Sequence, residues 1–167
     1  MNERIKICPV PKSQQPLYEY NSLKGSTEFS WTQSNTFEFL KVIILMCCIL
    51  FTIWGFILWN RNVPANFTIK QFLLITNINN ISVLIILIRY YLSWNYIYAR
   101  LAQATITYEE SGWYDAQTWV KPTQMLIQDR LIGSYEVLPI IQRLKRSITF
   151  FMLLIILGLL IFEFIIK

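Results

Sequence analysis

Three long runs of apolar residues, separated by more polar stretches, dominate the hydrophobic pattern of the chain. Val42–Trp59 carries no charged residue, Phe72–Ile88 is interrupted by three asparagines, and Ile148–Ile166 carries one charge, Glu163. A helix of about 20 apolar residues crosses a hydrocarbon core about 30 Å thick. Because lipid offers an unpaired backbone group no alternative partner, we expect each run to form a transmembrane helix.

The stretches that flank these runs follow other periods. Residues 89–104, "RYYLSWNYIYARLAQA", stay helical in pattern and carry the aromatic side chains typical of a membrane–water boundary, which predicts a second helix longer than its span. "ATITYEE" and "QTWVKP" are β-favouring and enclose the turn residues "SGWYDA", which predicts a short hairpin. An isolated hairpin is marginally stable, so we expect Trp113 and Trp119 to pack it against something else.

Prolines set the expectations for two further segments. The three prolines of "CPVPKSQQPLYEY", residues 8–20, predict an extended, polyproline-like strap instead of a helix. A helical pattern resumes after Pro122, but Gly133 and Pro139 argue against one unbroken helix. We therefore predict a break near Pro139 and a short helix that leads into the third span.

These patterns together predict a mainly α integral membrane protein. It has three transmembrane helices and a small stromal or cytoplasmic subdomain that contains a short β-hairpin and one or two helices. The expected segments are an extended N-terminal strap at 1–36, the first transmembrane helix at 37–59, a short lumenal-side loop at 60–71, the second transmembrane helix with an amphipathic extension at 72–104, the hairpin and helical segment at 105–147, and the third transmembrane helix at 148–167.

The basic residues predict the orientation of these spans. Lys and Arg are frequent before the first run and between the second and third runs, whereas the short first loop has Arg61 and Lys70. Basic residues favour the cytoplasmic or stromal side, so we expect the N-terminus and the hairpin segment to share that side. The net charge of +5 is then explained by residues beside membrane ends, and we expect the lipid bilayer, not nucleic acid, as partner.

Composition also narrows the chemistry. The chain has no histidine, which excludes histidine-based catalytic triads and histidine ligation of metals or haem. The three cysteines show no zinc-ligand spacing, and there is no glycine-rich phosphate loop. We therefore predict a protein that is not an enzyme and needs no cofactor.

Three motifs carry a resemblance to a known family: "CPVPKSQQPLYEY" at 8–20, "YEESGWYDAQTWVKP" at 108–122 and "DRLIGSYEVLPIIQRLKR" at 129–146. Together they resemble the plastid and cyanobacterial family called hypothetical chloroplast reading frame thirty-six, whose nuclear-encoded relatives are named for conservation in the green lineage and diatoms. The resemblance covers nearly the whole chain, with departures at Ser13 and Ala116. It implies a multi-pass membrane protein of the chloroplast or a cyanobacterium, and it implies little about activity. We favour a plastid membrane, and there the basic residues predict an N-terminus on the stromal side.

Aromatic density outside the spans suggests a docking role. The residue types that anchor protein interfaces occur in the strap and around the hairpin, at Tyr18, Tyr20, Trp31, Trp113, Tyr114 and Trp119. We therefore predict an accessory or assembly factor that docks on another membrane protein complex. The alternative for any one of these rings is that it packs the small subdomain against itself.

Two polar groupings leave alternatives open. The carboxylates of Glu109, Glu110, Asp115 and Asp129 could converge as oxygen ligands for iron, manganese or magnesium, which would make the protein a component of metal handling. The favoured alternative is that these acids pair with Lys121, Arg130 or Arg100. In the second run, Thr76, Asn77 and Asn80 share a helix face and predict interhelical hydrogen bonds in preference to a polar substrate path.

Overall fold

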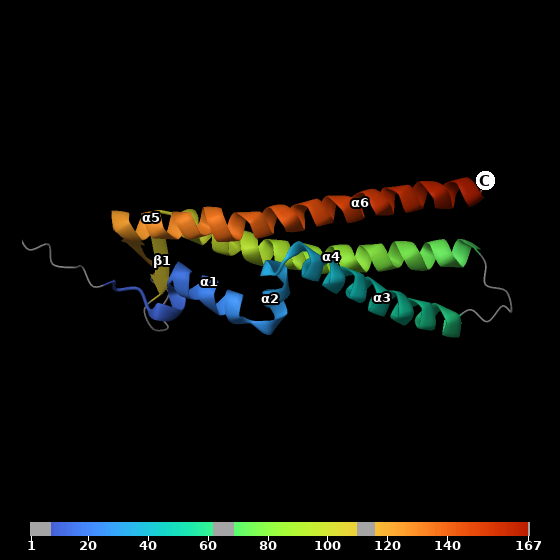
Figure 1. Ribbon diagram of the computed structural model, residues 1–167, viewed down its shortest axis with the longest axis horizontal. Coiled ribbons are helices and arrows are strands. Elements are labelled where there is room, and N and C mark those ends of the chain that lie inside the picture. Colours follow the sequence, from blue (N-terminus) through green and yellow to red (C-terminus); the bar gives the residue numbers. More distant parts are fainter. Residues whose placement is uncertain (1–7, 62–68, 110–115, 167) are drawn as a thin grey trace, which may run out of the picture. The chain divides into compact units, whose positions relative to one another are not determined.

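The computed structural model describes residues 8–61, 69–109 and 116–166, and these residues are mostly helical (Figure 1). The order of elements is a 3₁₀ turn η1 (Lys12–Gln14), helices α1 (Pro16–Gly25), α2 (Thr27–Gln33), α3 (Thr36–Arg61) and α4 (Ile69–Ala102), strands β1 (Thr105–Glu109) and β2 (Ala116–Val120), helix α5 (Thr123–Ile132), a π-helical turn η2 (Gly133–Val137) and helix α6 (Leu138–Ile166). The predicted fold class is confirmed.

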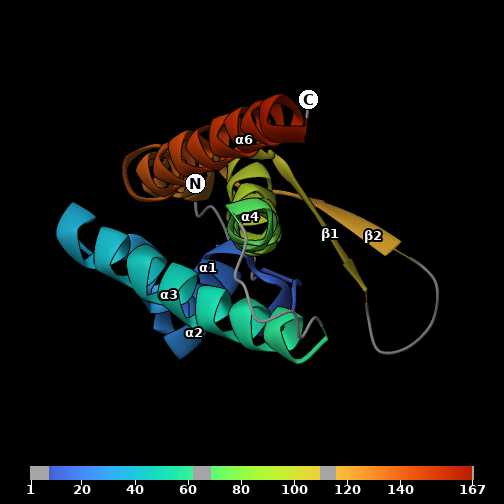
Figure 2. The ribbon, with the colours of Figure 1, turned by 90° about the vertical axis from the view of Figure 1, so that its right-hand side faces the viewer.

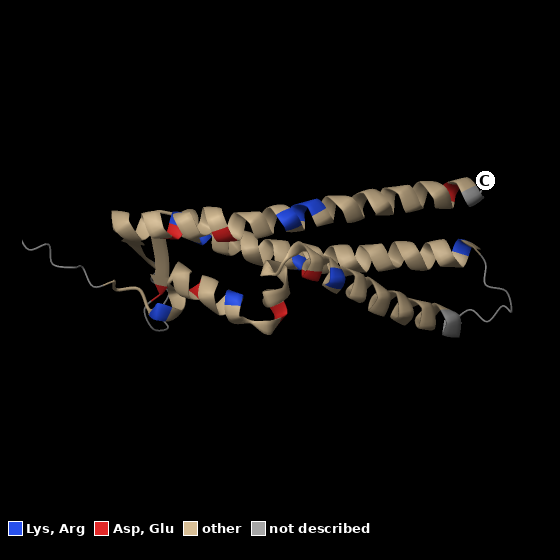
Figure 3. Cartoon of the chain, viewed as in Figure 1, with Lys and Arg blue, Asp and Glu red and all other residues tan. Residues whose placement is uncertain are grey.

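Three helical stretches are long and apolar enough to cross a membrane: Thr36–Leu58, Ile69–Ala102 and Thr123–Phe164. Figure 3 shows a long uncharged stretch of ribbon along each of α3, α4 and α6. Large apolar side chains such as Phe56, Leu153 and Phe164 point outward from these helices. Exposed apolar surface of this extent suits a hydrocarbon solvent and not water.

The chain divides into two compact units. The hairpin subdomain comprises Met1–Ser30 and Trp94–Pro139, and the helical unit comprises Trp31–Ser93 and Ile140–Lys167. Most of the uncharged helical sequence belongs to the helical unit, whereas the hairpin and α5 belong to the hairpin subdomain.

The predicted extended strap is wrong over Pro16–Gly25 and Thr27–Gln33, which form helices α1 and α2. Pro16 occupies the first turn of α1, where its missing N–H would have had no helical partner in any case. Glu19 places a negative charge in the same turn, where the helix dipole favours it. A proline that begins a helix and a proline that forbids one look alike in composition, and only position distinguishes them.

The predicted break near Pro139 is also wrong. The helix continues from α5 through η2 into α6, and Leu138 N–H donates to the carbonyl of Gly133, five residues earlier. Pro139 cannot donate a backbone hydrogen bond, and a wider π turn directly before it lets the helix pass this point without ending. The proline and the glycine mark a change of helical pitch instead of a boundary.

The predicted hairpin is confirmed, with β1 and β2 antiparallel and Thr105 opposite Val120 (Figure 2). Ile106 and Tyr108 alternate with exposed residues along β1 and form a small core with Val10. Trp119 of β2 and Cys8 pack against that core. Trp119 therefore supports the hairpin as expected, while Trp113 and its turn lie outside the described residues.

Two polar side chains of α4 that were predicted to bond to another helix bond to the backbone of their own helix instead. Thr76 Oγ1 donates to the carbonyl of Phe72 (2.8 Å) and Asn77 Nδ2 donates to the carbonyl of Leu73 (3.1 Å), both inside α4. Asn80 is buried. An interhelical bond does occur nearby, because Trp54 Nε1 of α3 donates to Ser82 Oγ (3.1 Å).

A glycine lies where α6 packs against Asn77 of α4 in the helical unit. A Cβ atom built on Gly158 would overlap the carboxamide of Asn77, whose Oδ1 is buried without a hydrogen-bond partner. A small residue at this point lets the two backbones approach, as is common between membrane helices. Gly55 of α3, by contrast, has nothing within 4 Å of the position of a Cβ.

We expect Gly158→Ala to lower the stability of the protein in detergent by about 1–3 kcal/mol, because the new methyl group must displace the Asn77 carboxamide. Gly55→Ala is the matched control, since it adds the same methyl group to open space on another apolar helix. Thermal unfolding monitored by tryptophan fluorescence compares the two. Equal midpoints for both variants would contradict the packing described for Gly158.

Candidate functional site

A buried ion pair holds the hairpin subdomain together. Lys121 Nζ lies 2.6 Å from Asp129 Oδ2 and also donates to the carbonyls of Arg100 (3.1 Å) and Leu101 (3.3 Å). The side chains of Lys121 and Asp129 are 0% and 1% exposed. Lys121 directly follows β2, Asp129 belongs to α5, and the two carbonyls end α4. One ammonium group therefore joins three elements.

The position of Lys121 follows from the end of α4. The last carbonyls of a helix have no partner within the helix and form the negative end of its dipole. A lysine ammonium has three donors, and here all three acceptors come from Asp129 and the end of α4. The backbone N–H of Lys121 also donates to the carbonyl of Ala104 (2.9 Å), which aligns the end of the hairpin with the end of the helix.

A second ionic contact joins α1 to α4. Arg100 Nη1 lies 2.6 Å from Glu19 Oε1, and Arg100 Nη2 donates to the carbonyl of Gln14 (2.9 Å). Burial raises the pKa of Glu19, and the nearby Arg100 charge partly offsets that rise. The Gln14 side chain in turn bonds both the carbonyl and the N–H of Glu109. The N-terminal segment is thus attached to α4 and to β1 by side-chain contacts.

A third polar contact lies on the π turn. The Glu136 carboxylate accepts hydrogen bonds from the hydroxyl of Tyr20 and from Lys24 Nζ, the latter at 2.8 Å. The hydrogen bond to Glu136 is the main cause that raises the pKa of Lys24 to about 12. Burial, with a further contribution from Glu136, raises the pKa of Tyr20, so its hydroxyl remains the donor.

The aromatic residues predicted to dock a partner have diverse environments. Tyr20 is 3% exposed and its ring lies 6.3 Å from that of Trp94, so it packs the subdomain. Trp119 is half-buried against the hairpin core, and Trp31 lies in the helical unit with its ring 5.3 Å from that of Phe39. Tyr18 is 54% exposed. Trp113 and Tyr114 lie outside the described residues.

An exposed apolar face that runs from α5 into η2 is the feature that sequence reasoning missed. Ile127, Leu131 and Tyr135 are 58%, 50% and 77% exposed and follow one another at intervals of four residues. We call these three residues the α5 stripe. Asp129 lies on the buried side of the same helix, so the ion pair to Lys121 turns the stripe outward. The four-residue spacing was visible in the sequence, but burial was needed to tell an outward stripe from a core one.

The predicted metal ligands are not brought together among the described residues. The Asp129 carboxylate is bonded to Lys121, as the favoured alternative had it, and Glu109 ends β1 with its backbone bonded to Gln14. Glu110 and Asp115 lie outside the described residues. Within residues 8–61, 69–109 and 116–166, no group of three His, Cys, Asp or Glu side chains could hold a metal ion.

The fold and these contacts define a class of protein: a mainly α membrane protein with three candidate spans and a small hairpin subdomain held by ion pairs. The sequence profile of the CGLD27-like family, described as conserved in the green lineage and diatoms 27, matches residues 8–150. The chain belongs to this family, which confirms the resemblance noted in its motifs.

Several relatives show how much of the chain is shared. It is 41% identical over 159 residues to the protein named ycf36 of Pyropia yezoensis, covering 93% of this chain and 94% of the relative. It is 39% identical over 142 residues to ycf36 of Cyanophora paradoxa, covering 85% of this chain and 89% of the relative. Identity is 38% over 140 residues to the chloroplastic protein conserved in the green lineage and diatoms 27 of Arabidopsis thaliana, covering 83% of this chain and 43% of the relative. No solved structure matches the chain.

We expect Lys121→Met to destabilise the hairpin subdomain by about 3–5 kcal/mol, because it leaves the Asp129 carboxylate buried without its partner. The double variant Lys121→Met with Asp129→Leu should recover much of that loss, since it removes both buried charges. Limited proteolysis of the purified protein, with cleavage sites mapped by mass spectrometry, measures the opening of the subdomain.

Lys24→Met is the matched control for the same substitution at an exposed ion pair. Lys24 and Glu136 are 47% and 48% exposed, so this variant should lose about 1 kcal/mol or less. If Lys121→Met and Lys24→Met resisted the protease equally well, the buried pair would not be what holds the subdomain together.

Proposed function

We propose that this protein is a non-enzymatic accessory or assembly factor of a plastid membrane that docks another membrane protein complex through its hairpin subdomain. The observation that carries the proposal is the α5 stripe. Three large apolar side chains, each at least half exposed, lie in line on a helix whose other side is fixed. Isolated exposed apolar residues are ordinary, but an aligned set is typical of a helix that binds protein.

The stripe is well prepared for binding because the structure around it is already ordered. Asp129 fixes the middle of α5 to Lys121, and Tyr20 and Lys24 hold Glu136 beside the last stripe residue, Tyr135. A surface that is rigid before binding loses little conformational entropy when a partner arrives. Tyr135, as the most exposed and aromatic member, is the residue type that most often dominates an interface.

The chemistry of the stripe selects a protein partner. Ile127, Leu131 and Tyr135 belong to the long helical stretch Thr123–Phe164 but precede its apolar run, Ile148–Ile166, and the proposal is that protein, not bilayer hydrocarbon, covers them. The partner that fits is a membrane protein with an apolar groove able to take side chains spaced by about one helical turn. Tyr18, which is 54% exposed in the same subdomain, is a second candidate contact.

The location of the docking surface is part of the proposal. The name of the Arabidopsis thaliana relative includes the word chloroplastic, which supports a plastid membrane. The basic residues before the first span and after the second favour the stromal side for the N-terminus and the hairpin subdomain. The stripe would then lie on the stromal face of a thylakoid or envelope membrane.

We expect Leu131→Glu to reduce recovery of partner proteins about tenfold or more in a gentle-detergent pull-down from the native membranes, because loss of one interface anchor costs about 2 kcal/mol or more. Thr118→Glu, which puts the same charge on the exposed part of β2, is the control and should leave recovery unchanged.

Elemental analysis of the same eluate separates the docking proposal from metal handling. Recovery of a defined complex without iron or manganese supports docking. A solitary protein that carries either metal, and that retains it in Leu131→Glu, would overturn docking in favour of a carboxylate site that includes Glu110 and Asp115.

A further inference from the structure

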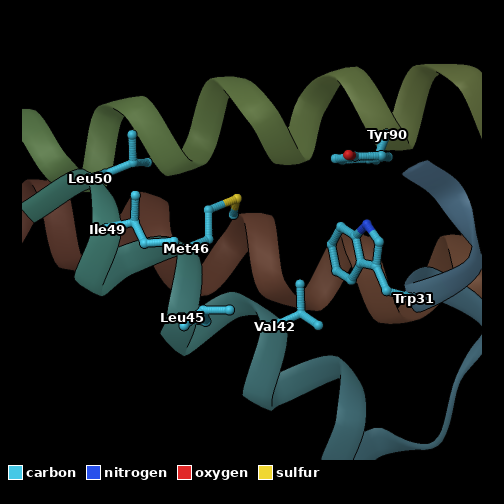
Figure 4. A pocket seen from close by; sticks show the side chains of 7 residues that line it. All are labelled: Trp31, Val42, Leu45, Met46, Ile49, Leu50 and Tyr90. Atoms are coloured by element: carbon cyan, nitrogen blue, oxygen red, sulfur yellow. The ribbon is translucent and has the colours of Figure 1, made fainter. Parts of the chain in front are cut away.

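A shallow groove in the helical unit has a composition and position that identify an occupant. Its walls are Trp31 of α2, Tyr90 of α4, and Val42, Leu45, Met46, Ile49 and Leu50 of α3, and its volume is about 270 Å³. Figure 4 shows the aromatic pair Trp31 and Tyr90 at one end, Ile49 and Leu50 at the other, and Met46 between them. The groove is therefore long and apolar, with an aromatic end and an aliphatic end.

The dimensions of the groove fit part of an acyl chain. Its α3 wall runs from Val42 to Leu50, about 12 Å of helix at about 1.5 Å per residue. Its volume is smaller than the 300–1,000 Å³ or so of most small-molecule sites. All five α3 residues belong to the first apolar run, and Leu45 and Ile49 are exposed, so the groove opens toward whatever surrounds α3. In a membrane that surrounding is lipid.

The aromatic end of the groove is also the cationic end. The guanidinium of Arg143 lies 5.4 Å from the ring centroid of Phe39, and that ring stacks on Trp31 with 5.3 Å between centroids. Arg143 Nη1 also donates to the carbonyl of Ser34 (2.6 Å), which fixes the guanidinium at this end. Lys41, directly before Val42, is exposed.

The other charges near this end do not reverse its sign. Glu38 of α3 is exposed one turn before Val42, and Lys145 and Arg146 are exposed on α6 close to Arg143 in the sequence. Arg89, directly before Tyr90 on α4, is exposed as well, so five basic residues accompany the carboxylate of Glu38. Basic residues beside a membrane helix attract anionic headgroups, and Trp and Tyr favour the same boundary depth.

We infer that this groove binds one acyl chain of an anionic glycerolipid, with the headgroup at the Trp31–Tyr90 end beside Lys41 and Arg143. The apolar walls exclude water from the chain, and the basic end selects the headgroup charge. This lipid site is independent of the proposed docking role, because none of its residues belongs to the α5 stripe.

Native mass spectrometry of the purified full-length protein tests the inference. The protein is equilibrated in nanodiscs that contain equal amounts of phosphatidylglycerol and phosphatidylcholine with the same acyl chains, and the retained lipid is counted. We expect phosphatidylglycerol to be retained about fivefold over phosphatidylcholine, the ratio that about 1 kcal/mol from a basic residue near an anionic lipid implies.

Three variants distinguish the groove from general surface charge. Met46→Trp fills the middle of the groove and should abolish retention, with Met46→Phe as the milder substitution if the first variant fails to insert. Ile53→Trp, on an exposed part of α3 that does not line the groove, should retain lipid as the original protein does. Lys41→Gln should lower the preference for phosphatidylglycerol while leaving the walls intact, because Arg143 remains at this end.

Two results would overturn the inference. Equal retention of both lipids by the original protein would show that the basic end does not select a headgroup. Selective retention that survives both Met46 variants but falls in Lys41→Gln would show attraction of anionic lipid to surface charge without a bound acyl chain.

Discussion

The hairpin subdomain depends on the burial of one ammonium group. Lys121 satisfies carbonyls at the end of α4 and the carboxylate of Asp129 at once, so the end of a helix, the end of a hairpin and the middle of α5 meet at a single point. A two-stranded hairpin has too little core to be stable alone, and here three residues, Val10, Ile106 and Tyr108, make up its buried apolar cluster. The ion pair supplies the attachment that this small core cannot.

The sequence predicted the elements whose cause is local. An apolar run long enough to span a membrane predicts a helix, and alternating β-branched residues around a turn predict a hairpin. Both signals are local in the sequence, so the three long helices and the hairpin could be predicted. The two errors of helix assignment both concerned proline. Helix α1 begins at Pro16, and a π turn directly before Pro139 lets the helix continue past that proline. In both cases the hydrogen bonds of neighbouring residues decide the outcome, and composition does not reveal their geometry.

The candidate site was less predictable because it depends on which side of each element is buried. Aromatic content marked Tyr20 and Tyr18 alike, yet the first is buried against Trp94 and the second is exposed. For Asp129 the sequence favoured an ion pair but left a metal ligand open, and the structure places Lys121 Nζ 2.6 Å from its carboxylate. The α5 stripe contains one aromatic residue in three, so a search for aromatic density passed over it.

Polar groups are satisfied differently in the two units, and this difference explains what each unit can bind. In the hairpin subdomain, charges are paired across elements, which fixes those elements and leaves apolar side chains of α5 free to face outward. In the helical unit, the polar groups of Thr76 and Asn77 bond mainly to the backbone of their own helix, and shape at Gly158 governs the approach of α4 and α6. Where helices pack by shape alone, grooves remain between side chains that do not fit closely together. One such groove lies along α3. In a membrane, lipid surrounds α3, so the groove faces lipid.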